Sequence, residues 1–298
     1  MTVVSGDRGA VYDRGYRPYD GPRGLRGAAT IALFKASIRR ALGIRRSWRQ
    51  KVAPFVLLGV VTIPAVVNVG IGYVTRDRID KLEIITYREY IGVSSALLLF
   101  VALVAPDVMC PDRRQRVLPL MFARPLTGVD YVVAKVGAIA SILFAFSFFP
   151  QVVLFLGNML VSDSASHYFT GHLDILWRVP VTAFLLALYY AVIGVAIGSL
   201  TDRRIVAGAG VIGLLLVTSI ASGILVGDEE RGNGSIAALI NILRLPLYLR
   251  DLVFLGHIER RTPLASVNNG GLLAVVTYLV VLLVGVGVLL RRYRWVER

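Results

Sequence analysis

The sequence predicts an all-α, polytopic membrane protein with six transmembrane helices, an N-terminal amphipathic interfacial helix and short re-entrant external helices before the last span. Apolar residues make up 56% of the chain and gather into six long runs, which arginine-rich breaks separate. The runs cover residues 52–75, 90–109, 132–161, 179–200, 205–227 and 272–290. A helix needs about 20 apolar residues to cross a bilayer. Residues 52–298 are therefore interpreted as one six-span domain, preceded by a cytoplasmic segment, 1–51.

The distribution of charge predicts the orientation. Residues 1–51 hold 12 Lys and Arg against three acids, and 23 of the 33 basic residues fall on the same side of the six spans. The positive-inside rule makes that side cytoplasmic, with both termini inside. The net charge of +14 then favours contact with anionic lipid over nucleic acid. Arginine outnumbers lysine 29 to 4, which is typical of a GC-rich bacterial genome, so we expect a multi-pass protein of the bacterial plasma membrane. Because residues 1–51 are polar, we expect no cleavable signal peptide.

Several classes of function are excluded by the residue inventory. The single cysteine, Cys110, has no partner for a disulfide, and the three histidines lack the spacing of a metal site. A proton-driven carrier would need a titratable group at mid-membrane, and none is apparent in the spans. The chain contains no GxxxxGK[ST] phosphate loop. We expect no enzyme activity and no cofactor in this chain.

Small residues recur at four-residue spacing in the fourth and fifth spans. The pairs are Gly194 with Gly198, Ala209 with Gly213, and Ser219 with Gly223. Such spacing lets helix backbones approach closely. The partner helix is either in the same bundle or in a second subunit.

The most specific pattern lies between the second and third spans. Asp112-Arg113 is followed by an amphipathic stretch, 117–122, then by Arg124-Pro125-Leu126, and then by Tyr131 four residues before Lys135. This order resembles the type-2 ABC transporter permeases, as does the N-terminal stretch 15–23. With six spans, the resemblance covers essentially the whole chain. Two departures are Arg116-Val117, where the family often has Gly-Thr, and Thr127-Gly128, where it often has an arginine.

The resemblance implies that this segment couples the spans to a separate ATPase. Apolar side chains would be buried in a cleft of that partner and arginines would meet its carboxylates. The predicted coupling residues are Asp112, Arg113, Arg114, Arg116, Leu118, Leu120, Arg124 and Pro125. The implied partners are two copies of a cytoplasmic ABC ATPase, which carry ATP and Mg²⁺, and a second permease subunit, identical or paralogous.

Upstream, one helical face of the cytoplasmic segment is apolar. It consists of Ile31, Phe34, Ile38 and Leu42, with arginines off the face. The pattern predicts an amphipathic helix in the membrane interface, ending or bending at Gly43. In the resembling family, this position is a connecting helix that also touches the ATPase.

The external region 227–271 contains two apolar stretches, 235–245 and 247–256, split by Pro246. They predict either short helices dipping into the outer leaflet, as the family implies, or a solvated cap. The family also places the substrate path along the second and fifth spans. Hydroxyl side chains lie there, at Ser94, Ser95, Thr218, Ser219 and Ser222.

An uncharged path suits a hydrophobic or amphipathic cargo such as a drug, a lipid or a peptide-like molecule. The sequence therefore predicts the permease subunit of an ATP-driven exporter. Two alternatives stay open: a non-transporting anchor or sensor that recruits an ATPase, and a self-sufficient channel or secondary carrier.

Overall fold

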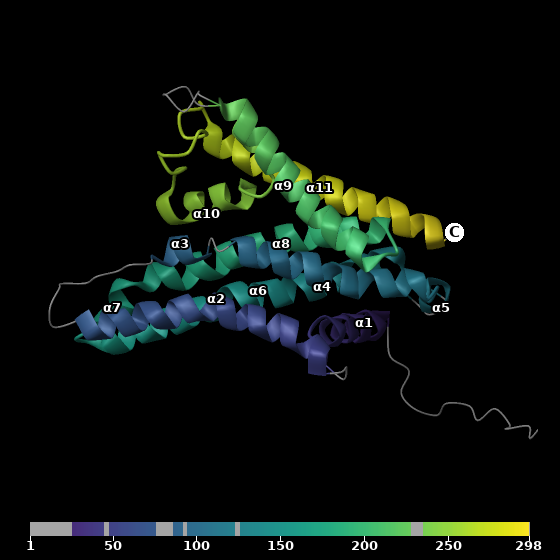
Figure 1. The fold of residues 1–298 in the computed structure, drawn as a ribbon, viewed down its shortest axis with the longest axis horizontal. Helices are drawn as coiled ribbons and strands as arrows, with labels where there is room; N and C mark the ends of the chain where they lie inside the picture. Colours follow the sequence, from purple (N-terminus) through teal and green to yellow (C-terminus); the bar gives the residue numbers. More distant parts are fainter. Residues whose placement is uncertain are drawn as a thin grey trace, which may run out of the picture.

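The computed structural model describes residues 26–44, 48–75, 86–91, 94–122, 126–227 and 235–297. Every regular element in these ranges is helical. The helices are α1 (Arg26–Ala41), α2 (Trp48–Thr75), α3 (Tyr87–Ile91), α4 (Ser94–Arg114), α5 (Leu118–Phe122), α6 (Gly128–Val161), α7 (Ala165–Gly171), α8 (Leu173–Leu200), α9 (Arg204–Val226), η2 (Ile236–Ile240), α10 (Leu245–Leu255) and α11 (Gly270–Glu297). The long helices run along one axis, so the bundle has an α5 end, where α1 and the C-terminus also lie, and an α7 end (Figure 1).

Five helices within the described ranges are long and apolar enough to cross a membrane, which indicates a multi-pass membrane protein. They are Pro54–Thr75, Gly128–Val161, Leu173–Leu200, Arg204–Val226 and Gly270–Arg294, and each contains or overlaps one predicted run. The run 90–109 falls largely in α4, which is not among the five. From Leu97, where its side chains are described, α4 carries four charges: Asp107, Asp112, Arg113 and Arg114. The sixth span stays a prediction.

Helix α8 is the centre of the bundle. In its most apolar stretch 72% of the residues are buried, whereas in the corresponding stretch of α2 only 11% are buried. Helices α4, α6 and α11 all pack against it. Gly194 and Gly198 of α8 face α4: a Cβ on Gly194 would clash with Val101 and lie 2.9 Å from the Ala105 Cβ. The first small-residue pair therefore serves packing within this chain.

Helices α2, α9 and α11 present broad apolar faces to the outside. Ile63 of α2 is 59% exposed, Ile224 of α9 is 74% exposed and Leu283 of α11 is 70% exposed. A water-soluble monomer rarely exposes so much contiguous apolar surface. These faces fit the hydrocarbon of a bilayer.

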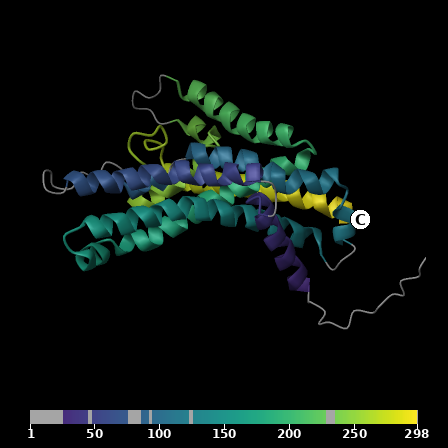
Figure 2. The ribbon, with the colours of Figure 1, turned by 60° about the horizontal axis from the view of Figure 1, so that its bottom comes forward.

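Helix α1 runs obliquely to the long helices (Figure 2) and packs against α6 and α4. It ends at the glycine that the sequence indicates. The N–H of Ile44 donates to the Arg39 carbonyl at 2.9 Å and that of Gly43 to the Arg40 carbonyl at 3.2 Å. Gly43 has φ +65°, the left-handed conformation that glycine adopts without a steric penalty at a helix C-terminus.

The segment of η2 and α10 is held against the interior of the bundle by side-chain hydroxyls. Tyr189 and Tyr190 of α8 donate to the carbonyls of Ile242 and Leu243, each at 3.0 Å. Tyr189 lies about 24 Å along α8 from its first residue, at 1.5 Å per residue. The turn between η2 and α10 therefore reaches the middle part of α8.

Two glycine substitutions test the packing of α8 on α4. Gly194→Ala should lower the free energy of unfolding by about 1–3 kcal/mol, because its Cβ overpacks the contact with Val101. Gly213→Ala, in α9, meets nothing within 4 Å and should be neutral or stabilising by about 0.5–1 kcal/mol, since alanine favours helix. Unfolding of the purified protein in detergent measures both. Equal losses would contradict the assignment of Gly194 to an internal contact.

Candidate functional site

Three helices converge at the α5 end of the bundle around one carboxylate, Asp112 of α4, which is fully buried. Its Oδ1 forms an ion pair with Arg40 of α1. Its Oδ2 lies 2.5 Å from the Nζ of Lys135 and accepts a hydrogen bond from the hydroxyl of Tyr131 at 3.0 Å. We call Asp112, Arg40, Tyr131 and Lys135 the Asp112 cluster. It joins α1, α4 and α6.

The start of α6 sets the register of two members. Thr127 caps the helix: its hydroxyl accepts from the Asp130 N–H, and the Asp130 carboxylate accepts from the Thr127 N–H at 3.0 Å. Tyr131 and Lys135 follow four residues apart, which places them on the same face of the helix. Thr127, at which the sequence differs from the pattern of the resembling family, is thus the N-cap of α6.

The Asp112 cluster holds one negative charge between two positive ones in a buried site. Asp112 lies past the apolar run of α4. Burial by itself would raise the pKa of its carboxyl group, but Lys135 and Arg40 outweigh this effect and hold the pKa below its usual range. Lys135, which is 1% exposed, also donates to the Val108 carbonyl at 3.0 Å. A buried ammonium needs such partners, because its desolvation is costly.

The end of α4 turns sharply into α5. The N–H of Val117 donates to the Asp112 carbonyl at 3.2 Å and that of Arg116 to the Arg113 carbonyl at 3.0 Å. This is the hydrogen-bond pattern of a Schellman motif. Arg116 has φ +52°, so it occupies the left-handed position where glycine is most common. Arg116-Val117, where the resembling family often has Gly-Thr, begins at this residue.

The predicted coupling residues divide into inward-facing and exposed groups. Arg113 donates to the Ser199 carbonyl and its Nε lies 3.0 Å from Asp202, while Leu118 is 8% exposed and belongs to the core. Arg114 and Arg116 are exposed. The Leu120 side chain, and Arg124 and Pro125 entirely, lie outside the residues that the structure describes.

The four predicted residues of the amphipathic face lie on or just after α1. Phe34 packs beside Gly137 of α6, where a Cβ would meet its ring at 3.5 Å. Ile38 and Leu42 contact the core, and Ile31 stays 54% exposed. The face that α1 turns to the bundle thus begins after Ile31.

The predicted path residues of α9 lie beside η2. Ser222 donates to the Ala237 carbonyl at 3.1 Å, and Ser219 accepts a hydrogen bond from Asn241 at 3.2 Å. Thr218 donates to its own helix, to the Leu214 carbonyl at 2.8 Å. The side chains of Ser94 and Ser95 lie outside the described set.

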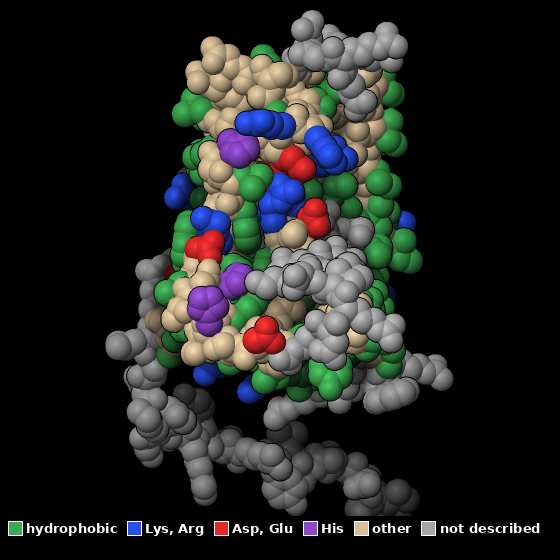
Figure 3. Space-filling view, turned by 90° about the vertical axis from the view of Figure 1, so that its left-hand side faces the viewer, with side chains coloured by type: hydrophobic (Ala, Val, Ile, Leu, Met, Phe, Trp, Pro, Cys, Tyr) green, Lys and Arg blue, Asp and Glu red, His purple; other side chains and the backbone are tan. Residues whose placement is uncertain are grey.

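A second charged cluster lies toward the α7 end, where acidic and basic side chains are intermixed (Figure 3). Arg250 and Asp251 of α10 are both buried and form an ion pair at 2.8 Å. Arg88 lies 3.6 Å from Asp251 and 3.5 Å from Glu259. Two basic and two acidic groups thus neutralise one another and tie α10 to α3.

The described residues include no group of three or more His, Cys, Asp or Glu side chains that could hold a metal ion. Cys110 is buried, with its Sγ 3.5 Å from the Thr201 carbonyl. No protein-family model, curated protein or solved structure matches the chain.

Two residues of this site, Arg40 and Tyr293, belong neither to the predicted coupling residues nor to the Tyr-xxx-Lys pattern. Arg40 lies 72 positions before Asp112, and no local spacing connects them. Tyr293 of α11 packs at a tilt against Tyr131, with ring centroids 4.7 Å apart and an interplanar angle of 45°. Lys135 did give a signal, because a lone basic residue near the start of a long apolar run needs a buried acidic partner.

Removing the charge of Asp112 should destabilise the bundle strongly. Asp112→Asn keeps the shape of the side chain but leaves Lys135 buried without a counter-charge, at a cost of about 3–5 kcal/mol. The free energy of unfolding in detergent measures this cost.

Asp107→Asn is the matched control on the same helix. Asp107 pairs with Arg204, but the two side chains are 36% and 43% exposed, so the loss should be about 0–1 kcal/mol.

Because the folded pKa of Asp112 is depressed, its stabilisation is present at neutral pH and lost as the pH falls through that pKa. The Asp112→Asn variant should lack this acid-dependent loss. Equal costs for the two variants would contradict the role of burial.

Proposed function

We propose that this chain is the membrane-spanning permease subunit of an ATP-driven ABC exporter in a bacterial plasma membrane. Six spans, with α4 as the second, would leave both termini in the cytoplasm. ATP and Mg²⁺ would be bound by two copies of a separate ATPase. The cargo would be hydrophobic or amphipathic: a drug, a lipid or a peptide-like molecule.

The Asp112 cluster is the observation that carries this proposal. Asp112 is the acid of the Asp-Arg pair, and it contacts both residues of the Tyr-xxx-Lys pattern, Tyr131 and Lys135. These contacts form although Asp112 and Lys135 are 23 positions apart. Orientation in the membrane requires only basic residues on one side. A buried, fully paired cluster built from these particular residues favours a segment with a mechanical role.

The arrangement supports coupling through rigid-body motion. The exposed arginines, Arg114 and Arg116, flank the turn into α5 and are available to carboxylates of a partner. Leu118 anchors α5 in the core. A displacement of α5 by the ATPase would then pass to α4 through the turn, to α11, against which α5 packs, and to α6 through the ring contact of Phe122 with Tyr131. Arg40 would carry it to α1.

The proposed second span is supported by the packing of α4. It contacts α6, α8 and α9, three helices that are each apolar enough to cross a membrane. A Cβ on Gly208 of α9 would lie 2.7 Å from the Ala102 carbonyl oxygen, so the two helices approach closely. A helix in this position shares the depth of its neighbours.

The position of η2 and α10 supports the re-entrant alternative over a solvated cap. Tyr189 and Tyr190 hold the turn between them at the middle part of α8. The buried Arg250–Asp251 pair neutralises the charges of α10 internally, which lowers the cost of placing them near lipid. In the proposed exporter these short helices would border the exit of a path along α4 and α9, at the interface with a second permease subunit.

Labelling of introduced cysteines tests the orientation. Cysteines at Ser166 and Asn268 should react with an impermeant thiol reagent added outside intact cells, and one at Thr127 should react only after the membrane is opened. Cys110 is buried and should give little background. A cysteine in place of Asn268 that reacts only from inside would contradict the six-span topology.

Charge reversal tests the coupling. Arg114→Glu with Arg116→Glu should weaken association with the ATPase at least tenfold, because loss of charge-assisted contacts costs about 2–5 kcal/mol. Co-purification from the native host and ATP hydrolysis by the complex measure it. The isolated chain should hydrolyse no ATP.

The matched control reverses Arg260 and Arg261, an exposed pair in the loop between α10 and α11. Both double variants should insert normally. If the ATPase binds the two variants equally well, the α4–α5 turn is an ordinary basic loop and the residue-level support for a permease is lost.

A further inference from the structure

We propose that a pocket at the α5 end binds the phosphate group of an anionic phospholipid. The pocket has a volume of about 450 Å³ and lies between the ends of α4, α8 and α11. Its polar wall is formed by Arg113, Arg291, Arg292 and Tyr293. This inference depends on the membrane location of the chain and not on any ATPase.

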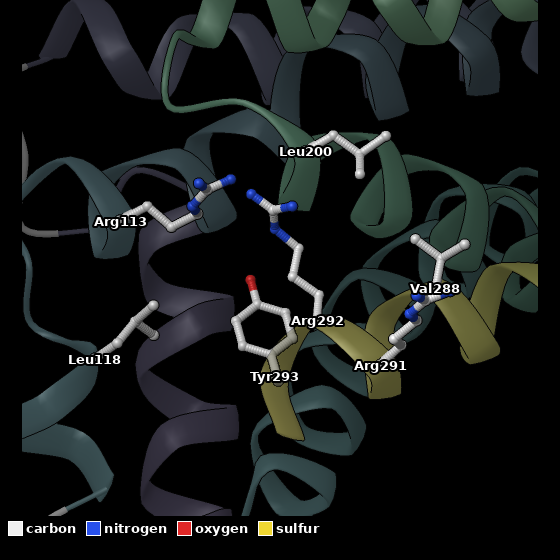
Figure 4. A pocket seen from close by; sticks show the side chains of 7 residues that line it. All are labelled: Arg113, Leu118, Leu200, Val288, Arg291, Arg292 and Tyr293. Atoms are coloured by element: carbon white, nitrogen blue, oxygen red, sulfur yellow. The ribbon is translucent and has the colours of Figure 1, made fainter. Parts of the chain in front are cut away.

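The positive charges in the pocket favour the binding of an anion. Figure 4 shows the guanidinium groups of Arg113 and Arg292 turned toward each other above the hydroxyl of Tyr293. Arg113 is partly neutralised by Asp202 at 3.0 Å. Within the described ranges no carboxylate forms an ion pair with Arg291 or Arg292. Like charges that face each other repel, and an anion between them converts the repulsion into attraction.

Tyr293 supplies a hydrogen-bond donor at the same place. Its side chain is 1% exposed, and its hydroxyl has no hydrogen bond of normal geometry to any described residue. The neighbouring Tyr131 hydroxyl, which donates to Asp112, gives Tyr293 only a contact outside normal hydrogen-bond geometry. Buried polar groups nearly always have a partner, and a phosphate oxygen between the arginines would accept from Tyr293.

The apolar wall favours a lipid over a free anion. Leu200 and Val288 line the pocket and are 56% and 37% exposed. A little more than one turn up α11 from Val288, Leu283 and Val284 are 70% and 60% exposed. This apolar face gives acyl chains a surface to follow away from the arginines. Basic pockets between transmembrane helices on the cytoplasmic side bind anionic headgroups in this way.

The test uses the full chain purified in non-ionic detergent without an ATPase. Lipid binding is measured by native mass spectrometry and by the rise in melting temperature. The probes are phosphatidylglycerol, phosphatidylcholine with the same acyl chains, and inorganic phosphate. The wild-type protein should bind phosphatidylglycerol at least about tenfold more tightly than either other probe, since only that probe combines net negative charge with acyl chains.

Three variants locate the site. Arg291→Gln with Arg292→Gln should weaken binding of phosphatidylglycerol about tenfold or more, and Tyr293→Phe, which removes only the hydroxyl, about threefold to tenfold. Arg203→Gln with Arg294→Gln removes two exposed arginines outside the pocket and should change binding less than about twofold, as expected for screened surface charges. Melting temperatures without lipid show whether each variant is folded.

Three results would overturn the proposal. An equal loss in the control variant would show general attraction of anionic headgroups to the basic surface. Equal binding of inorganic phosphate would show a free-anion site. Unchanged lipid binding in the Arg291/Arg292 variant would show that phosphatidylglycerol binds elsewhere on the protein.

Discussion

The carboxylate of Asp112 is the constraint on which the α5 end of this molecule depends. A buried acid must be paired, and here Lys135, Arg40 and Tyr131 supply the partners from two other helices. The three contacts can be satisfied together only when α1, α4 and α6 come together in one arrangement. Breaking a buried pair costs more than making it gains, so the cluster fixes geometry more than it adds stability.

This constraint separates two tasks within a short segment. Asp112 and Leu118 face inward and fix where α4 ends and α5 begins, whereas Arg114 and Arg116 face solvent. Arg116 adopts the left-handed conformation that closes α4, a position where glycine would be less strained. An exposed arginine thus occupies this position at a steric cost, which is compatible with the proposed contact of its side chain with a partner.

The apolar runs predicted five helices well, because 20 or more uncharged residues leave few alternatives to a membrane helix. The run 90–109 also overlaps α4, but α4 carries Asp107, Asp112, Arg113 and Arg114 toward its C-terminus and is not among the five. The small-residue spacing left two alternatives open, and contacts of Gly194 with Val101 and Ala105 assign it to the interior. The link between Arg40 and Asp112 could not be predicted. It joins residues 72 positions apart whose meeting depends on how α1 packs on α6.

Basic side chains are neutralised within the chain toward one end of the bundle but not at the other. Toward the α7 end, Arg88 and Arg250 are neutralised by Asp251 and Glu259 within the chain. At the α5 end the Asp112 cluster is itself net positive, and Arg291 and Arg292 add guanidinium groups that no described carboxylate neutralises. A surface with surplus positive charge must find anions outside the protein, either in lipid headgroups or on a partner. By the positive-inside rule this asymmetry favours a cytoplasmic α5 end, which is the end that the proposed lipid or ATPase would contact.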